Sequence, residues 1–250
     1  MKKFFWLFLV CFLLLSLEVG ATTTNYTLYD SLSPSIQENI SKEEFCNLPY
    51  ALQMSVANYG INQTDTLSEK SSAGYISGYS SFNTYVDMNF SQGGNSSTSS
   101  TTCVPISCAN VLSYFKYRGY SNLFNTSVIT QSDFNQICSD VGWTNSNAST
   151  LAKACTGLNT YAKRKGYTIT NYSLLTSNWT GLKNYINNNT PLIVSELSST
   201  PGKKGHAYTV LGYRTTNGSN EIYVQTGISL IPYTWISWSL ISQAKAFVIN

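Results

Sequence analysis

The fold is decided by the stretch TTCVPISCANVL at residues 101–112, which predicts a buried helix with a cysteine at its start. From Val104 onward, apolar side chains recur at the three- and four-residue spacing of one helix face. Pro105 falls in the first turn, where its missing N–H takes no hydrogen bond from the helix. The spacing therefore places Cys108 on the core face and Cys103 just before the helix.

Cys103 lies beside the N–H groups that begin this helix and at the positive end of its dipole. Both features favour a thiolate over a thiol, which is typical of a reactive cysteine. We therefore interpret Cys103 as a poised nucleophile and Cys108 as a packed side chain. The alternative is that both cysteines are packed, or that they form one disulfide.

The composition is that of a folded, weakly charged protein. The chain has 250 residues, 42% of them hydrophobic and only 11% charged, so it can bury a core. This length allows one domain with an appendage, or two small domains. The net charge is +3, and the basic residues are not clustered along one segment of the sequence, so no nucleic-acid partner is expected.

The first residues predict export. Lys2 and Lys3 precede an apolar run at residues 4–17, which is short for a membrane span. The segment Val19-Gly20-Ala21 fits the small-residue rule for signal-peptide cleavage. We therefore expect a signal peptide over residues 1–21 and a mature protein that starts at Thr22. The mature protein is then secreted, with no retained membrane span.

Five cysteines remain after this leader: Cys46, Cys103, Cys108, Cys138 and Cys155. An odd number in an oxidising compartment leaves one thiol outside any intramolecular pair. That number suits one nucleophile and up to two disulfides. A Cys138–Cys155 bridge is the first pairing we expect.

Residues 22–81 are predicted to be an N-terminal extension or a pro-segment, because they are too few for a confident core of their own. Ser41 and Glu44 form a capping-box pattern at the start of a helix. Gly60 is placed to end a helix that follows Pro49. Residues 41–60 are therefore expected to hold one or two short helices.

The main domain is predicted over residues 82–250, with helices first and strands second. Helical spacing recurs in segments 103–119, 134–141, 151–166 and 179–189, and short apolar strand patterns follow at 191–194, 206–213, 221–225, 235–238 and 246–249. Asn217-Gly218 predicts a two-residue hairpin that sets Arg214 opposite Glu221. This order indicates an α+β fold with an antiparallel sheet.

His206 is the one histidine of the sequence, so any imidazole chemistry requires it. It begins a predicted strand, and it follows Cys103 in the chain order of a cysteine nucleophile and its histidine base. The base takes the thiol proton and returns a proton to the leaving amine. The alternative is a histidine with a purely structural role.

Several segments resemble the papain-fold cysteine peptidases, closest to the bacterial branch with bacteriocin-leader-peptidase-like and streptopain-like proteins. CVPISCANVLSYF at 103–115 is similar to the nucleophile helix of that fold, and GHAYTVLGY at 205–213 to its histidine strand. YVDMNFSQ at 85–92 resembles the lead-in to its oxyanion-hole glutamine. WISWS at 235–239 and AFVI at 246–249 resemble its closing strand.

The resemblance implies a papain-like fold, in which a helical half with the nucleophile helix packs on an antiparallel sheet. It implies that Cys103 is the nucleophile, His206 the base and Gln92 an oxyanion donor beside the Cys103 N–H. Peptide bonds would be hydrolysed through a thioester. The expected partner is a peptide or protein substrate, with no cofactor and no metal, and the protein is expected to be a monomer.

The sequence departs from the family at the position that orients the histidine. An Asn or Asp is expected within residues 224–227, and neither is present. Gln225 is predicted to accept a hydrogen bond from the imidazole, with Thr226 as a weaker alternative. Two other functions stay open: an inactive binding module at the cell surface, and an acyl-transfer or peptidoglycan amide hydrolase on the same scaffold.

Overall fold

The computed structural model describes residues 28–60, 74–75, 102–126, 128–144, 147–196, 205–228 and 231–250. The chain divides into two compact units, and residues 28–60 belong to one while the other described residues belong to the second. The predicted signal peptide lies outside the described residues. Within the described ranges, no helix has both the length and the apolar character needed to cross a membrane.

The described part of the N-terminal unit includes three short helices, α2 (Pro34–Gln37), α3 (Lys42–Asn47) and α4 (Tyr50–Tyr59). The predicted capping box is confirmed, because the Ser41 side chain accepts from the Glu44 N–H and the Glu44 carboxylate accepts from the Ser41 N–H. Gly60 ends α4 with a φ of 81°, a value that favours glycine. Phe45, Leu52 and Val56 are fully buried.

Among its described residues, the second unit has four α-helices: α5 (Cys103–Tyr117), α6 (Gln131–Asp140), α7 (Leu151–Arg164) and α8 (Trp179–Asn187). Two short 3-10 helices, η3 (Ser121–Leu123) and η4 (Trp238–Leu240), complete its helical content among the described residues. All four predicted helices are confirmed. Every side chain of α5 from Cys103 to Phe115 is buried, as expected for a helix enclosed by the protein on all sides.

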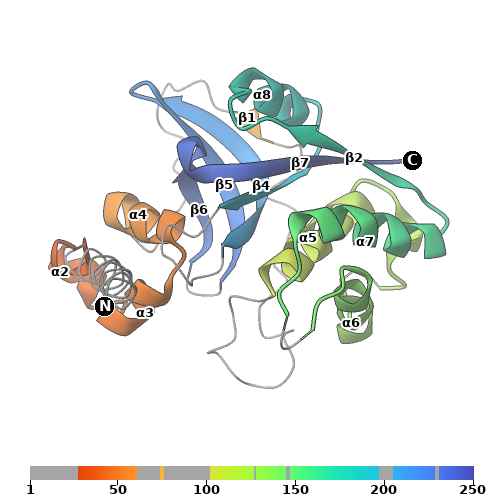
Figure 1. The fold of residues 1–250 in the computed structure, drawn as a ribbon, viewed down its shortest axis with the longest axis horizontal. Helices are drawn as coiled ribbons and strands as arrows, with labels where there is room; N and C mark the ends of the chain where they lie inside the picture. The colour runs from red at the N-terminus through yellow and green to blue at the C-terminus, as the bar shows by residue number, and fades with distance from the viewer. Residues whose placement is uncertain are drawn as a thin grey trace, which may run out of the picture. The chain divides into compact units, whose positions relative to one another are not determined.

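The second unit also contains one antiparallel sheet (Figure 1). Its strands are β1 (Gly74–Tyr75), β2 (Ile169–Leu174), β3 (Leu192–Glu196), β4 (His206–Thr216), β5 (Ser219–Ile228), β6 (Ile231–Ser237) and β7 (Ile241–Ile249). The order is β2-β7-β3-β4-β5-β6, with β1 beside β4. Helix α5 packs against β3, β4 and β5, while α7 packs against β2, β3 and β7. The α+β prediction is thus confirmed.

The hairpin between β4 and β5 has the predicted turn and register. Asn217 and Gly218 both have positive φ, at 50° and 79°, as a type I′ turn requires. Arg214 lies directly opposite Glu221, and the Arg214 Nε donates to the Glu221 Oε2 at 2.7 Å. The turn sequence therefore sets the register of the strand that begins at His206.

Two features differ from the sequence-based expectations. Strand β2 was not predicted, because it is a largely polar edge strand whose middle residues face solvent. The expected Cys138–Cys155 disulfide is wrong: both residues carry thiols. Cys138 lies in α6 and Cys155 in α7, and each is buried there as a small apolar side chain.

Candidate active site

Cys103 is the first residue of α5, and only 5% of its surface is exposed. The main-chain N–H of Ala207 donates to the Cys103 sulfur. Ala207 directly follows His206, which begins β4. The fold therefore brings the predicted nucleophile against the start of the predicted histidine strand, although the two segments are far apart in the sequence.

Buried polar contacts hold α5 against β4. The Thr209 hydroxyl donates to the carbonyl oxygen of Ser107 at 3.4 Å, and the Asn110 Nδ2 donates to that hydroxyl at 3.4 Å. Both distances are long, so each bond contributes little on its own. They matter for position, because buried polar groups are normally hydrogen-bonded and these groups find their partners on the facing element. A shift of α5 along β4 would break both bonds, so they help to hold the start of α5 in place.

The His206 ring is oriented by the main chain of β5. Its Nε2 lies 2.8 Å from the carbonyl oxygen of Thr226, and both residues are buried. A carbonyl oxygen can only accept, so the Nε2 atom carries a proton. In the neutral ring, Nδ1 then keeps its lone pair and can act as a base.

The Thr226 carbonyl is itself held in place by the side chain of its own residue. The Thr226 hydroxyl oxygen accepts from the Ile228 N–H at 2.9 Å, and the hydroxyl donates to the carbonyl oxygen of Ile231. These contacts tie the end of β5 to the start of β6. The residue whose carbonyl accepts from His206 is therefore held by contacts with Ile228 and Ile231.

Of the two predicted glutamines, Gln225 is in the described part of the chain and does not contact the His206 Nε2. The Gln225 side chain donates to the Tyr233 hydroxyl at 3.3 Å, whereas the His206 Nε2 bonds to Thr226. The orienting contact observed is thus a main-chain oxygen, which no side-chain motif can reveal. Gln92 and its lead-in at residues 85–90 lie outside the described residues.

The electrostatics of Cys103 are dominated by its burial. Burial raises the pKa of the Cys103 thiol, and the nearby Glu196 carboxylate raises it further. The main-chain N–H groups of Ala207, Val104 and Cys103 lower this pKa, but the net direction is upward. The expectation of a thiolate favoured by the helix end is therefore wrong for the resting site, because desolvation outweighs the N–H groups.

Burial also lowers the pKa of His206, since it disfavours the charged imidazolium. The Thr226 carbonyl and the Glu196 carboxylate oppose this shift. A raised thiol pKa and a lowered imidazole pKa leave both groups neutral near pH 7. The directions of these two shifts favour a neutral thiol and a neutral imidazole over an ion pair.

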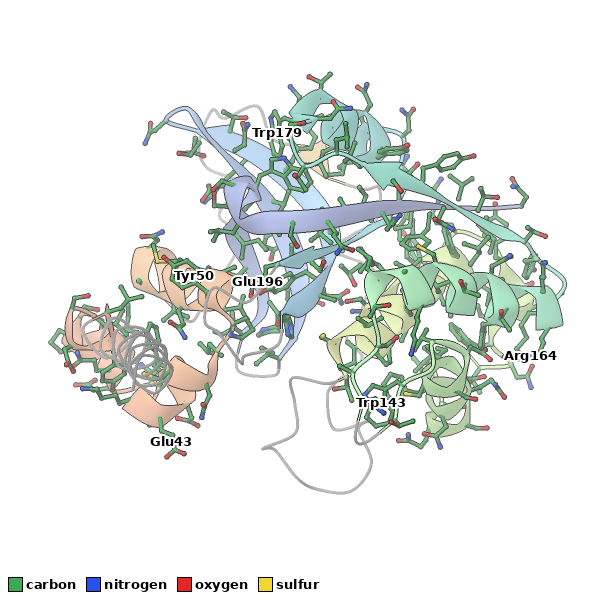
Figure 2. All side chains as sticks on the ribbon, viewed as in Figure 1. Glu43, Tyr50, Trp143, Arg164, Trp179 and Glu196 are labelled. Carbon is green, nitrogen blue, oxygen red and sulfur yellow. The ribbon has the colours of Figure 1, made fainter. Side chains whose placement is uncertain are left out.

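Glu196 is the residue of this site that sequence reasoning missed. It ends β3, lies on the central sheet (Figure 2), and is only 4% exposed. Its Oε1 accepts a hydrogen bond from the Tyr208 hydroxyl at 3.0 Å. The signal in the sequence was its position two residues after the apolar run at residues 192–194. A carboxylate so close to a buried run deserves notice, because carboxylates are rarely buried without a partner.

Metal ligation finds no support in the described part of the chain. No three side chains of His, Cys, Asp or Glu gather there in a way that could hold a metal ion. The described side chains of the site bring a thiol, an imidazole and a carboxylate to it.

Comparison with known proteins supports the resemblance. A search of curated proteins found no match. The model of the Peptidase_C39-like family matches residues 79–229, a span that contains Cys103, His206, Gln92 and Gln225. This match covers more than half of the chain, and the mixed helix and antiparallel sheet agree with it. The chain belongs to the Peptidase_C39-like family, of the papain-like cysteine peptidase type.

Proposed function

We propose that this protein is a secreted cysteine peptidase that hydrolyses peptide bonds, with Cys103 as nucleophile and His206 as base. The observation that carries the proposal is the hydrogen bond from the Ala207 N–H to the Cys103 sulfur. It sets the thiol beside the residue that follows the one histidine of the sequence. The family match supports the same class of reaction.

The first half of the reaction acylates the cysteine. The Cys103 thiol gives its proton to the His206 Nδ1, and the sulfur attacks the carbonyl carbon of the scissile bond. The carbonyl electron pair moves onto oxygen, where the Cys103 N–H and the Gln92 amide are the proposed donors. The C–N bond then breaks, and the proton on Nδ1 passes to the leaving amine.

The second half restores the enzyme. Water loses a proton to the His206 Nδ1 and attacks the thioester carbon. The C–S bond breaks, the carboxylic acid leaves, and the sulfur recovers its proton from His206. Throughout both halves Nε2 keeps its proton and donates it in a hydrogen bond to the Thr226 carbonyl oxygen, so Nδ1 remains the reacting nitrogen.

The neutral resting pair suits a thiol that is activated by substrate. A buried thiolate would need solvation that this site does not offer. Proton transfer to His206 can instead accompany attack, when the negative charge moves from the sulfur to the substrate oxygen. General-base assistance of this kind contributes about 10²- to 10⁴-fold in rate.

Export and processing are part of the proposal. The sequence pattern of a signal peptide at residues 1–21 supports secretion, and residues 22–81 are proposed to be an N-terminal extension or a pro-segment. N-terminal sequencing of the protein released from the producing cells tests both points. A mature start at Thr22 supports an extension, a start near residue 82 supports a removed pro-segment, and an intact Met1 contradicts export with cleavage.

The activity is tested with a complex mixture of peptides whose new amino termini are read by mass spectrometry. The wild type is expected to generate new termini, whereas Cys103→Ala and His206→Ala generate none above background. Cys138→Ala is the matched control, because it removes a buried thiol of α6 that the proposed mechanism does not use, and it should leave cleavage intact. Equal cleavage by wild type and Cys103→Ala, or none by a folded wild type, would contradict the proposal.

A further inference from the structure

A buried carboxylate lies next to the histidine and has no role in the reaction described above. Glu196 is directly opposite His206 in the antiparallel β3–β4 pair. Opposed residues in such a pair project from the same face, with their side chains in contact range. Glu196 is 4% exposed and His206 is 3% exposed. The carboxylate and the imidazole are therefore neighbours in a site that excludes most water.

Tyr208 holds this carboxylate in place. It lies two residues after His206 on β4, and the two ring centroids are 4.7 Å apart with an edge-on arrangement. Its hydroxyl donates to the Glu196 Oε1 at 3.0 Å. Burial and the Glu196 charge raise the pKa of Tyr208 well above its usual value, so this hydroxyl remains a donor. Tyr208 thus fixes the carboxylate on the His206 side of the sheet.

We propose that Glu196, held by Tyr208, is a positioning residue that stabilises the imidazolium form of His206. This inference rests on the proposed cysteine peptidase function and adds a residue to it. Once the sulfur bonds to the substrate, its negative charge has moved to the carbonyl oxygen, while the imidazolium persists. Glu196 then keeps the proton on His206 until the leaving amine accepts it.

The surroundings of the imidazole support this assignment. Glu196 faces it from β3, Tyr208 from its own strand and the Thr226 carbonyl from β5, while the Cys103 sulfur accepts from the N–H of the next residue, Ala207. Cys103 and Tyr208 hold their protons near pH 7, because burial raises the pKa of both. Within the described part of the site, Glu196 is then the acidic group that supplies negative charge to His206. It raises the pKa of His206 against the effect of burial.

The test uses the single histidine of the sequence, whose Hε1 proton gives one unambiguous NMR signal in tag-free protein. The His206 pKa is measured by titration in the wild type and in Glu196→Gln, which keeps the shape of the side chain and removes its charge. We expect the pKa to fall by about one unit or more, as for loss of an opposite charge at close range. Glu196→Asp should give an intermediate value.

Glu221→Gln is the matched control. Glu221 is another buried acid of the same sheet, but it pairs with Arg214 rather than with His206, so its replacement should leave the titration unchanged. If Glu196→Gln does not fold, the proposal is tested by the decrease in the His206 pKa from wild type to Glu196→Asp. An unchanged pKa overturns the proposal, as does a wild-type imidazole that stays neutral down to acid unfolding. The titration needs no substrate, so a failed cleavage assay would be a separate result.

Discussion

The Nε2 atom of His206 lies 2.8 Å from the main-chain oxygen of Thr226. In this protein a peptide carbonyl therefore makes the contact that fixes the tautomer of the histidine. The Thr226 hydroxyl locks that peptide through Ile228 and Ile231. The side chain of Thr226 should consequently affect catalysis through the position of its own carbonyl.

Thr226→Val is expected to lower kcat by about 100-fold, because it removes both contacts of the hydroxyl and lets the carbonyl shift away from His206. Steady-state cleavage of a fluorogenic peptide found in the mixture experiment measures this effect. Gln225→Ala is the comparison, and it should lower kcat by less than about tenfold, since Gln225 contacts Tyr233 instead. A folded Gln225→Ala variant that is the more impaired of the two would show that the glutamine orients the histidine.

The stability of the protein should fall in alkali because of Cys138. Burial raises the pKa of this thiol from 9.0 to about 12. Between these values the unfolded chain releases the proton and the folded chain keeps it, so folding loses about 1.4 kcal/mol per pH unit from this group. Urea unfolding measures the free energy of unfolding at pH 8.5 and at pH 10.5. The decrease between these two pH values should be smaller in Cys138→Ala than in the wild type, by about 1 to 2 kcal/mol.

The variant Cys46→Ala controls for loss of a thiol as such, because Cys46 lies in the N-terminal unit and is only half-buried. Its stability should decline with pH as steeply as that of the wild type. Identical pH slopes for wild type and Cys138→Ala would show that Cys138 titrates normally in the folded protein.

Gly157 should not tolerate a methyl group, although it lies inside α7. A Cβ atom there would approach the Val141 Cγ1 to 2.6 Å and the Asp140 carbonyl oxygen to 2.9 Å. Gly→Ala within a helix ordinarily stabilises by about 1 kcal/mol. Here we expect Gly157→Ala to destabilise by about 1 to 3 kcal/mol, because the backbone at the end of α6 must move.

Chemical denaturation measures this change, with Thr156→Ala on the exposed side of the same helix as the reference. That substitution should change the free energy of unfolding by less than about 0.5 kcal/mol. A Gly157→Ala protein more stable than the wild type would mean that α6 and α7 are not packed as closely as the structure has them.

The ion pair of the hairpin should contribute to stability through both charge and stacking. The Arg214 Nε lies 2.7 Å from the Glu221 Oε2, and the Arg214 guanidinium lies 4.2 Å from the Trp235 ring centroid. Arg214→Lys keeps the charge but loses the planar contact, so we expect a cost of about 1 kcal/mol. Thermal unfolding measures it, and a cost below about 0.3 kcal/mol would show that the stacking contributes nothing.

The sequence predicted those parts of the fold that depend on local periodicity. The spacing of apolar residues around Cys108 is enough by itself to indicate a helix. The backbone preferences of Asn217-Gly218 are likewise enough to predict a turn. The polar edge strand β2 carries neither signal, and its existence depends on pairing with β7. The Cys138–Cys155 pairing failed because a cysteine count does not distinguish a bridge from two packed thiols.

The site shows the same division between local and tertiary information. Cys103 and His206 could be proposed because each stands at the start of an element that the sequence marks. Glu196 could not, because it meets His206 only through the register of β3 against β4. The Thr226 carbonyl is invisible to sequence, since every residue has one. The raised pKa of Cys103 depends on burial, which local spacing does not report.

The central claim is that His206 activates the Cys103 thiol, and the alkylation rate of Cys103 tests it most directly. Wild type and His206→Ala are treated with iodoacetamide near pH 7, and the adduct is located by peptide mass spectrometry over time. We predict that Cys103 reacts at least about tenfold faster in the wild type, because only there can the thiol pass its proton to a base. Equally slow reaction at Cys103 in both proteins would contradict the account.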